Sequence, residues 1–165
     1  MSKHRTAPRQ HEMCGFTLLE LMVTLSIVGI VAAAAVPSVR DMANNSIAER
    51  TTGLFELDLD FARSQAVSLG ELVRIERRDN DIANGWEVKV DSSGQILKQR
   101  AALDDGVTIV SSSQLNSIAF TPTGQIENTD TITIRTEGCT GSKDRSYSFL
   151  RSGQIEVTEL ACIPN

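Results

Sequence analysis

A long apolar run near the amino terminus constrains this chain more than any other stretch of its sequence. From Phe16 to Val36 the residues read FTLLELMVTLSIVGIVAAAAV, and Glu20 is the one ionisable side chain among these 21 residues. A helix needs about 20 predominantly apolar residues to cross the hydrocarbon core of a bilayer, at a rise of about 1.5 Å per residue. Because hydrocarbon offers no partner to backbone polar groups, the run is predicted to form a single transmembrane helix over residues 16–36.

Glu20 is the unusual residue of this run. A carboxylate is costly in hydrocarbon, so an ionisable residue inside a membrane segment is a functional candidate by default. The positive end of the helix stabilises it, and a cationic amine from a neighbouring helix would stabilise it more. The small residues Gly29 and Ala32–Ala35 would let such helices approach one another closely. The simpler interpretation is a signal-anchor helix with Glu20 at the headgroup boundary.

Residues 1–15 form a basic leader, which would keep this side of the membrane cytoplasmic. Two interpretations of the leader remain open. It is either part of a secretory signal that is cleaved after the alanines of the apolar run, or it ends at Gly15 and the apolar run stays in the mature chain. The leader's charged residues are Lys3, Arg5, Arg9 and Glu12.

The six residues Gly15–Glu20, GFTLLE, resemble the prepilin-peptidase site of type IV pilins and type II secretion pseudopilins. The resemblance implies that a membrane peptidase cuts between Gly15 and Phe16 and methylates the new amino terminus of Phe16. It implies that Glu20, at the fifth mature position, pairs with the Phe16 amine of an adjacent subunit. Pro37 corresponds to the proline that often kinks the anchor helix. The resemblance makes the chain a substrate of this peptidase and gives it no enzymatic activity.

The pattern of a helix continues over residues 37–70. Apolar residues recur three or four positions apart with charged residues between them, as is typical of a helix with one face on a core. Gly70 is well suited to end it, and the weak helix formers Asn44–Ser46 and Thr51–Gly53 are expected to loosen it locally. The expected apolar stripe consists of Val39, Met42, Ala43, Ile47, Leu54, Leu57, Phe61, Ala62, Ala66 and Leu69.

After Gly70 the pattern changes to the period of two that is typical of strands. One long helix followed only by strands predicts an α+β fold, with antiparallel sheet laid on the helix and a β-rich globular domain over residues 71–165. Trp86, Phe120 and Phe149 are expected to fill its core. The predicted strands are Leu72–Glu76, Trp86–Val90, Gln95–Lys98, Val107–Val110, Ser117–Thr121, Thr131–Thr136, Arg145–Leu150 and Gln154–Thr158.

Motifs in this later part are similar to the GspH/FimT/FimU group of minor pilins and minor pseudopilins, and the likeness covers nearly all of the mature chain. The resemblance implies the pilin fold, a long helix against two small β-sheets. It implies a single span of the inner membrane with the globular domain in the periplasm, and later incorporation into a filament. The implied partners are the prepilin peptidase, other minor pilins and the major pilin. The motifs are Phe61–Val67, Leu72–Ile75, Gly85-Trp86 and Ile118–Gly124.

The three cysteines divide into one and two. Cys14 lies in the leader and is expected to leave with it. Cys139 and Cys162 remain as an even pair in a part that faces an oxidising compartment, which predicts a disulfide. It would close a loop of about 24 residues and contribute about 3 kcal/mol in the chain-entropy model. Two free buried thiols are the alternative, whereas zinc lacks ligands because His4 and His11 both lie in the leader.

No catalytic constellation is found in the mature sequence, which has no histidine and no glycine-rich phosphate loop. The carboxylate pairs Asp58/Asp60 and Asp104-Asp105 are attributed to a solvated face or a turn. The sequence therefore predicts no enzyme, no cofactor and no metal.

Three functions are compatible with these observations. The leading one is a structural subunit of the tip or priming complex of a type IV pilus, and an H-type minor pseudopilin of a type II secretion system shares its mechanism. The third is DNA capture, because some FimT-like members use a Gly-Arg-x-Arg motif near the carboxyl terminus. This chain has Gly153–Glu156, GQIE, at that place, and acidic neighbours offset Lys143, Arg145 and Arg151. The net charge of −5 also disfavours DNA.

Overall fold

The computed structural model describes residues 16–113 and 117–163. The leader, including Gly15 and Cys14, lies outside the described residues. The chain divides into two compact units, one ending at Ser38 and one running from Val39 onward, and each is described by itself below. Helix α1, Leu18–Leu69, contributes its first part to one unit and the rest to the other.

The first part of α1 begins with a side-chain cap. Thr17 Oγ1 accepts a hydrogen bond from the backbone N–H of Glu20 at 3.1 Å, which satisfies one of the free donors at a helix start. Among the described residues, α1 is the one helix long and apolar enough to span a membrane. The helix continues through Pro37, although proline removes one backbone hydrogen bond. A bend at Pro37 stays a prediction.

The second part of α1 carries the buried face of the globular unit, at spacings of three and four. The expected stripe was wrong at several positions, because Leu57 is 60% exposed and Val39, Met42 and Leu69 also face solvent. The observed stripe shares Ala62 and Ala66 with the expected one, but elsewhere it includes polar residues that hydrophobicity does not mark. Its members are Ala48, Thr51, Thr52, Phe55, Asp58, Leu59, Ala62 and Ala66.

The expected loosening of α1 is also absent. The helix is continuous over Asn44–Ser46 and Thr51–Gly53, and the Thr52 hydroxyl donates to the carbonyl of Ala48 at 2.9 Å within the helix. The helix ends as predicted, at Leu69, and Gly70 takes a positive φ of 67° that glycine adopts without steric cost.

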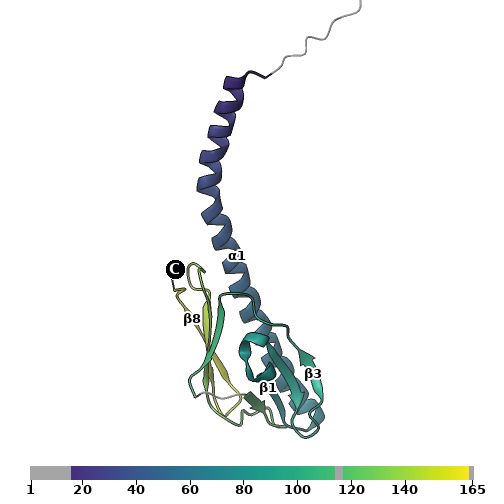
Figure 1. The fold of residues 1–165 in the computed structure, drawn as a ribbon. Coiled ribbons are helices and arrows are strands. Elements are labelled where there is room, and N and C mark those ends of the chain that lie inside the picture. Colours follow the sequence, from purple (N-terminus) through teal and green to yellow (C-terminus); the bar gives the residue numbers. More distant parts are fainter. Residues whose placement is uncertain (1–15, 114–116, 164–165) are drawn as a thin grey trace, which may run out of the picture. The chain divides into compact units, whose positions relative to one another are not determined.

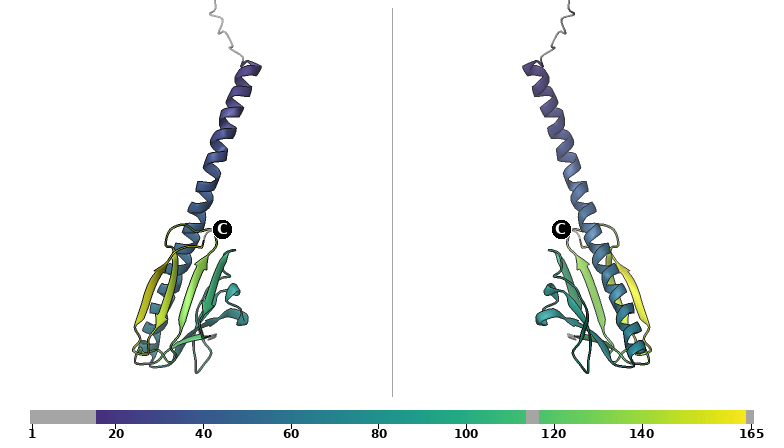
Figure 2. Two further views of the ribbon diagram at one scale, coloured as in Figure 1. Left: turned by 90° about the vertical axis from the view of Figure 1, so that its left-hand side faces the viewer. Right: turned by 90° about the vertical axis from the view of Figure 1, so that its right-hand side faces the viewer.

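Two antiparallel four-stranded sheets follow, as Figure 1 and Figure 2 show, and both contribute side chains to the core beside α1. The first sheet has the order β3-β2-β1-β5 and the second β4-β6-β7-β8. All eight predicted strands are present within two residues of their expected bounds, so the predicted α+β fold of one long helix with antiparallel sheets is confirmed. The strands are β1 Val73–Arg77, β2 Trp86–Val90, β3 Ile96–Gln99, β4 Val107–Ser111, β5 Ser117–Phe120, β6 Thr131–Thr136, β7 Asp144–Phe149 and β8 Ile155–Leu160, with short 3-10 turns η1 Arg78–Asn80 and η2 Ile82–Asn84.

Phe55 of α1 links the two sheets at the centre of the core. Its ring meets Trp86 of β2 edge-on at a centroid distance of 5.5 Å, and it meets Tyr147 of β7 at 5.2 Å. Edge-to-face pairs of this kind add about 0.5–1.5 kcal/mol beyond the area they bury. Trp86, Phe120 and Phe149 are all buried, which confirms their predicted place in the core.

Candidate functional site

The start of α1 presents the residues of the predicted processing and assembly site. Phe16 is 84% exposed, and Glu20 lies one helical turn further on, also exposed. Within the part of the chain that the structure describes, the Glu20 carboxylate has neither an ion pair nor a hydrogen bond, while its backbone N–H is capped by Thr17. This carboxylate is therefore open to a cation from another molecule.

The surface that follows Glu20 is apolar on every side of the helix. A helix of this kind is typical of a membrane span or of a helix buried among others. Its two hydroxyl groups are satisfied internally, since Thr24 donates to the carbonyl of Leu21 at 2.9 Å and Ser26 to that of Met22 at 2.8 Å. Polar groups closed in this way suit a hydrocarbon environment. The large exposed side chains are Leu18, Leu19, Leu21, Met22, Val23, Leu25, Ile27, Val28, Ile30 and Val31.

In the globular unit, two asparagines of α1 hold the loop over residues 138–141. Asn44 donates through its side-chain amide to the carbonyl of Gly138 at 3.1 Å. Asn45 donates to the hydroxyl of Thr140 at 2.9 Å and accepts from the Thr140 N–H at 2.8 Å. These residues are weak helix formers, and the sequence pattern marked them only as a place of loosening. Their side chains instead make the contacts that connect the helix to this loop.

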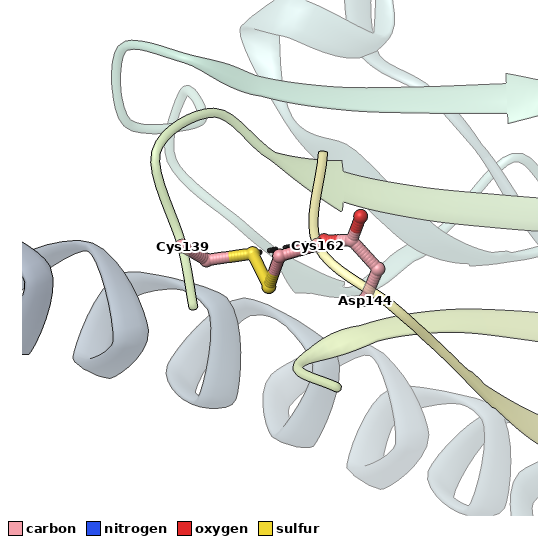
Figure 3. A group of neighbouring side chains, drawn as sticks. All are labelled: Cys139, Asp144 and Cys162. Carbon is pink, nitrogen blue, oxygen red and sulfur yellow. Dashed lines mark hydrogen bonds between the residues drawn. A yellow bond between two sulfur atoms is a disulfide. The ribbon is translucent and has the colours of Figure 1, made fainter. Parts of the chain in front are cut away.

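The same loop carries the disulfide between Cys139 and Cys162, whose Cα atoms are 5.5 Å apart, so the predicted pairing is confirmed. Figure 3 shows the Asp144 carboxylate beside it, and Asp144 Oδ1 lies 3.4 Å from Cys139 Sγ. Asp144 is buried and accepts the backbone N–H of Thr136 at 2.9 Å. The two sulfurs and this carboxylate could together face a metal ion. However, both sulfurs are committed to the disulfide, and thiolates are the form that binds metals.

Asp58 is a buried carboxylate that the sequence analysis wrongly assigned to a solvated face. Its side chain is fully buried, and it accepts from Trp86 Nε1 at 2.9 Å and from Arg100 at 2.6 and 2.9 Å. Lys98 Nζ lies 2.7 Å from its Oδ1. Burial by itself raises the pKa of Asp58, but the hydrogen bonds from Arg100, Lys98 and Trp86 outweigh it and hold this pKa below its usual range. A carboxylate saturated in this way is structural.

Asp60 and the pair Asp104-Asp105 match the prediction of a solvated face or a turn more closely. Asp60 is exposed, and Asp105 lies in an exposed turn before β4. Asp104 pairs with Arg50 of α1, which fixes the segment before β4 to the helix. No signal in the sequence separates Asp58 from Asp60, because the pattern of buried positions depends on which face of α1 meets the sheets.

The carboxyl-terminal segment compared with the DNA-binding motif is held by its glycine. Gly153 is buried with a φ of 89°, and a Cβ there would lie 2.2 Å from the carbonyl oxygen of Gly124. Gln154 and Glu156 face solvent. Among the neighbouring cations, Lys143 pairs with Glu49, and Arg145 pairs with Glu159 at 3.0 Å. Two of the three expected cations are thus already neutralised by carboxylates.

Comparison with known families matches both parts of this chain. A family model described as the type II transport protein GspH matches residues 51–153, and a model described as the prokaryotic N-terminal methylation motif matches residues 13–36. The fold is similar to crystal structures of the type IV minor pilin FimU from Pseudomonas aeruginosa. One has a TM-score of 0.52 and 19% identity over 76% of this chain and 97% of that chain. Another has a TM-score of 0.50 and 24% identity over 72% of this chain and 98% of that chain.

Proposed function

The chain belongs to the family of the type II transport protein GspH and carries the N-terminal methylation motif, and from this premise we propose that it is a minor pilin of a type IV pilus. In this proposal it is a low-abundance subunit of the tip or priming complex, and its globular domain contacts other minor pilins. The observation that carries the proposal is the exposed Glu20, whose carboxylate has no partner among residues 16–113 and 117–163, at the head of a helix that is apolar on all sides.

Processing comes first in the proposed sequence of events. The prepilin peptidase cuts between Gly15 and Phe16 at the inner membrane, and the new amino group of Phe16 is methylated. The chain then spans the inner membrane once, with its globular domain in the periplasm. Amino-terminal sequencing of the membrane form tests this step, and a mature chain that begins near Pro37 would contradict it.

Assembly follows from the charge of Glu20. In a bundle of packed anchor helices, this carboxylate pairs with the Phe16 amine of an adjacent subunit, so neither charge is left alone in hydrocarbon. We expect Glu20→Ala to be processed normally but to enter sheared filaments several-fold less than the unmodified chain. Ser26→Ala is the matched control, because the Ser26 hydroxyl bonds only within its own helix. If Glu20→Ala entered filaments normally, Glu20 would have no role in assembly and would only mark the headgroup boundary of the membrane.

A second candidate is the H-type minor pseudopilin of a type II secretion system. The observation that favours it is the match to the family model described as a type II transport protein. Both candidates use the same anchor, so a deletion strain separates them: loss of surface pili supports the pilus, and loss of a secreted enzyme supports the secretion system. DNA capture is not favoured, because Lys143 and Arg145 are paired with carboxylates.

A further inference from the structure

A cavity of about 440 Å³ lies in the globular unit between the two sheets. Its walls are mainly apolar, and it falls in the range of about 300–1,000 Å³ that is usual for binding pockets. Strands of both sheets, α1 and η2 contribute to it, through residues that include Phe55, Ile75, Ile82, Ile109 and Ile118. We refer to it as the inter-sheet cavity.

The strand β4 forms one rim of this cavity and is an edge strand of its sheet. Gly106 accepts from the Glu137 N–H, and the Ser112 N–H donates to Thr131, both at 2.9 Å. In an antiparallel ladder, hydrogen-bonded and non-hydrogen-bonded pairs alternate. The backbone N–H and C=O groups of the even-numbered residues of β4 therefore point toward β6, and those of the odd-numbered residues point outward, away from the sheet. The N–H of Val107 does point away and bonds Asp104 at 3.1 Å.

Ile109 is the next outward-facing residue of β4. Its N–H and C=O have no backbone partner within the described residues. The facing edge strand, β5, is partly covered, because Ala119 accepts from the Glu127 N–H at 3.0 Å. Among the described residues, the unpaired backbone edge beside the inter-sheet cavity is therefore that of β4 at Ile109, which η2 approaches. An open edge of this kind can pair with an added strand.

Arg77 supplies a positive group at the same cavity. Along β1, Val73 and Ile75 are buried, and the period of two places Arg77 on their side of the sheet, directly opposite the buried Trp86. Its Nε is buried without an acceptor, and no ion pair of Arg77 occurs among the described residues. Buried polar groups are nearly always paired, so the Nε–H of Arg77 is available to an acceptor from another molecule.

We propose that the inter-sheet cavity and the edge of β4 bind an extended segment of another filament subunit, which adds as a strand beside Ile109. An apolar side chain of that segment fills the cavity, and a carboxylate two positions along accepts from Arg77. Backbone pairing provides affinity, and alternate side chains provide specificity, as in other strand additions. This proposal rests on the proposed function, because it assigns a contact to a subunit of the filament.

The test uses the full chain in detergent micelles, labelled for NMR. The probe is the peptide acetyl-Thr-Val-Thr-Glu-Thr-amide at millimolar concentration, whose valine and glutamate are two positions apart, and the matched control peptide has glutamine in place of glutamate. The amide of Ile109 reports on strand addition, and the Nε–H signal of Arg77 reports on the carboxylate. We expect both signals to shift with the glutamate peptide, and we expect it to bind about tenfold more tightly than the glutamine peptide, as for a hydrogen bond to a charged group.

Three variants separate the parts of the proposal. Arg77→Gln removes the difference between the two peptides. Ile109→Pro removes the outward N–H without breaking the ladder to β6, since proline is tolerated at an edge, and it abolishes binding of both peptides. Arg74→Gln is the matched control, because Arg74 lies on the opposite face of β1 and pairs with Asp91. It leaves the difference between the peptides unchanged.

Several outcomes would overturn the proposal. They are equal affinity of the two peptides for the unmodified chain, shifts confined to β8, or no binding. Dodecanoate, a fatty-acid carboxylate, is added as a further probe. If it shifts the Arg77 signal and the peptides do not, the cavity binds an amphiphile and the proposal is wrong. If a variant fails to fold, the comparison of the two peptides on the unmodified chain still decides. Glu20→Ala leaves peptide binding unchanged, so failure of this inference is distinguishable from failure of filament assembly.

Discussion

Asp58 is a buried carboxylate that receives polar contacts from three side chains, those of Trp86, Lys98 and Arg100. It lies on α1, and its donors come from β2, β3 and the segment after β3, so one carboxylate connects the helix to the first sheet. Burying an ion pair costs desolvation, and its hydrogen bonds offset that cost only while every partner is present. The loss of the charge at Asp58 would therefore leave Arg100 and Lys98 without their counter-ion.

We predict that Asp58→Asn lowers the free energy of unfolding at neutral pH by about 2–3 kcal/mol. The pKa of Asp58 is lowered in the folded state. Its contribution is therefore present above the ordinary carboxyl pKa of about 4 and is lost as the pH falls through the lower, folded-state value. The variant should unfold with a weaker dependence on pH in this acid range. Urea denaturation at several pH values measures both effects.

The matched control for Asp58→Asn is Asp60→Asn, because Asp60 lies on the exposed face of the same helix. It should change stability by less than about 0.5 kcal/mol, as surface substitutions usually do. Similar losses in the two variants would mean that the Asp58 contacts contribute little.

At the level of secondary-structure elements, the strands were predictable and the buried face of α1 was not. Each strand alternates between the two faces of its sheet, and this period is visible in β2, where Trp86, Val88 and Val90 are buried. Along α1 the buried stripe includes Thr51, Thr52 and Asp58, whose polarity hides the helical period. The side chains that bind Asp58 come from β2, β3 and the segment after β3, and the local sequence of α1 does not specify them. The inter-sheet cavity was missed for the same reason.

The contact between α1 and the loop over residues 138–141 gives a prediction at this scale. Asn44→Ala should raise helix propensity by about 0.5 kcal/mol but leave the Gly138 carbonyl without its donor, at a cost of about 1–3 kcal/mol. We expect a net loss of about 1 kcal/mol in the free energy of unfolding. Ser46→Ala is the control, because the Ser46 hydroxyl bonds only Met42 of its own helix. A gain in stability for Asn44→Ala would show that the loop contact is weak.

Two glycine turns give a second prediction for the elements. Gly153→Ala combines a positive φ with a Cβ 2.2 Å from the Gly124 carbonyl, so it should destabilise the unit by more than about 2 kcal/mol. Gly94 also has a positive φ, 69°, but a Cβ there meets open space. Gly94→Ala should therefore cost about 1–2 kcal/mol. Thermal unfolding measures the loss of stability in each variant. Equal losses would contradict the close approach of Gly153 to the Gly124 carbonyl.

For the molecule as a whole, both the net charge and the pairing of its cations disfavour binding to nucleic acid. The net charge is −5, and the structure pairs Lys143 and Arg145 with Glu49 and Glu159. The pairing of Lys143 could not be predicted from the sequence, because Glu49 is almost one hundred residues away along the chain. Glu159 was expected to offset the nearby cations, and it lies directly opposite Arg145 on the neighbouring strand. The effect of both pairings is to reduce the small basic patch that the sequence analysis left open.

We predict that the full chain in micelles shows no appreciable binding to duplex DNA at physiological salt. Gln154→Arg with Glu156→Arg should raise the affinity, and the salt slope should steepen by about two because each added cation releases roughly one counterion. Titration of labelled duplex at two salt concentrations measures this. The same charge change at Gln95 and Glu71 is the control. Micromolar binding by the unmodified chain would make DNA capture the leading function.

The disulfide has a mechanical consequence. Cys162 lies just after β8 and is bonded to Cys139 of a loop that Asn44 and Asn45 hold on α1. Tension applied beyond Cys162 therefore passes through a covalent bond to this loop and then to the helix. It does not peel β8 away from β7, which is the weakest mode of loading for an edge strand. A subunit built this way keeps its second sheet folded when the end of the chain is pulled.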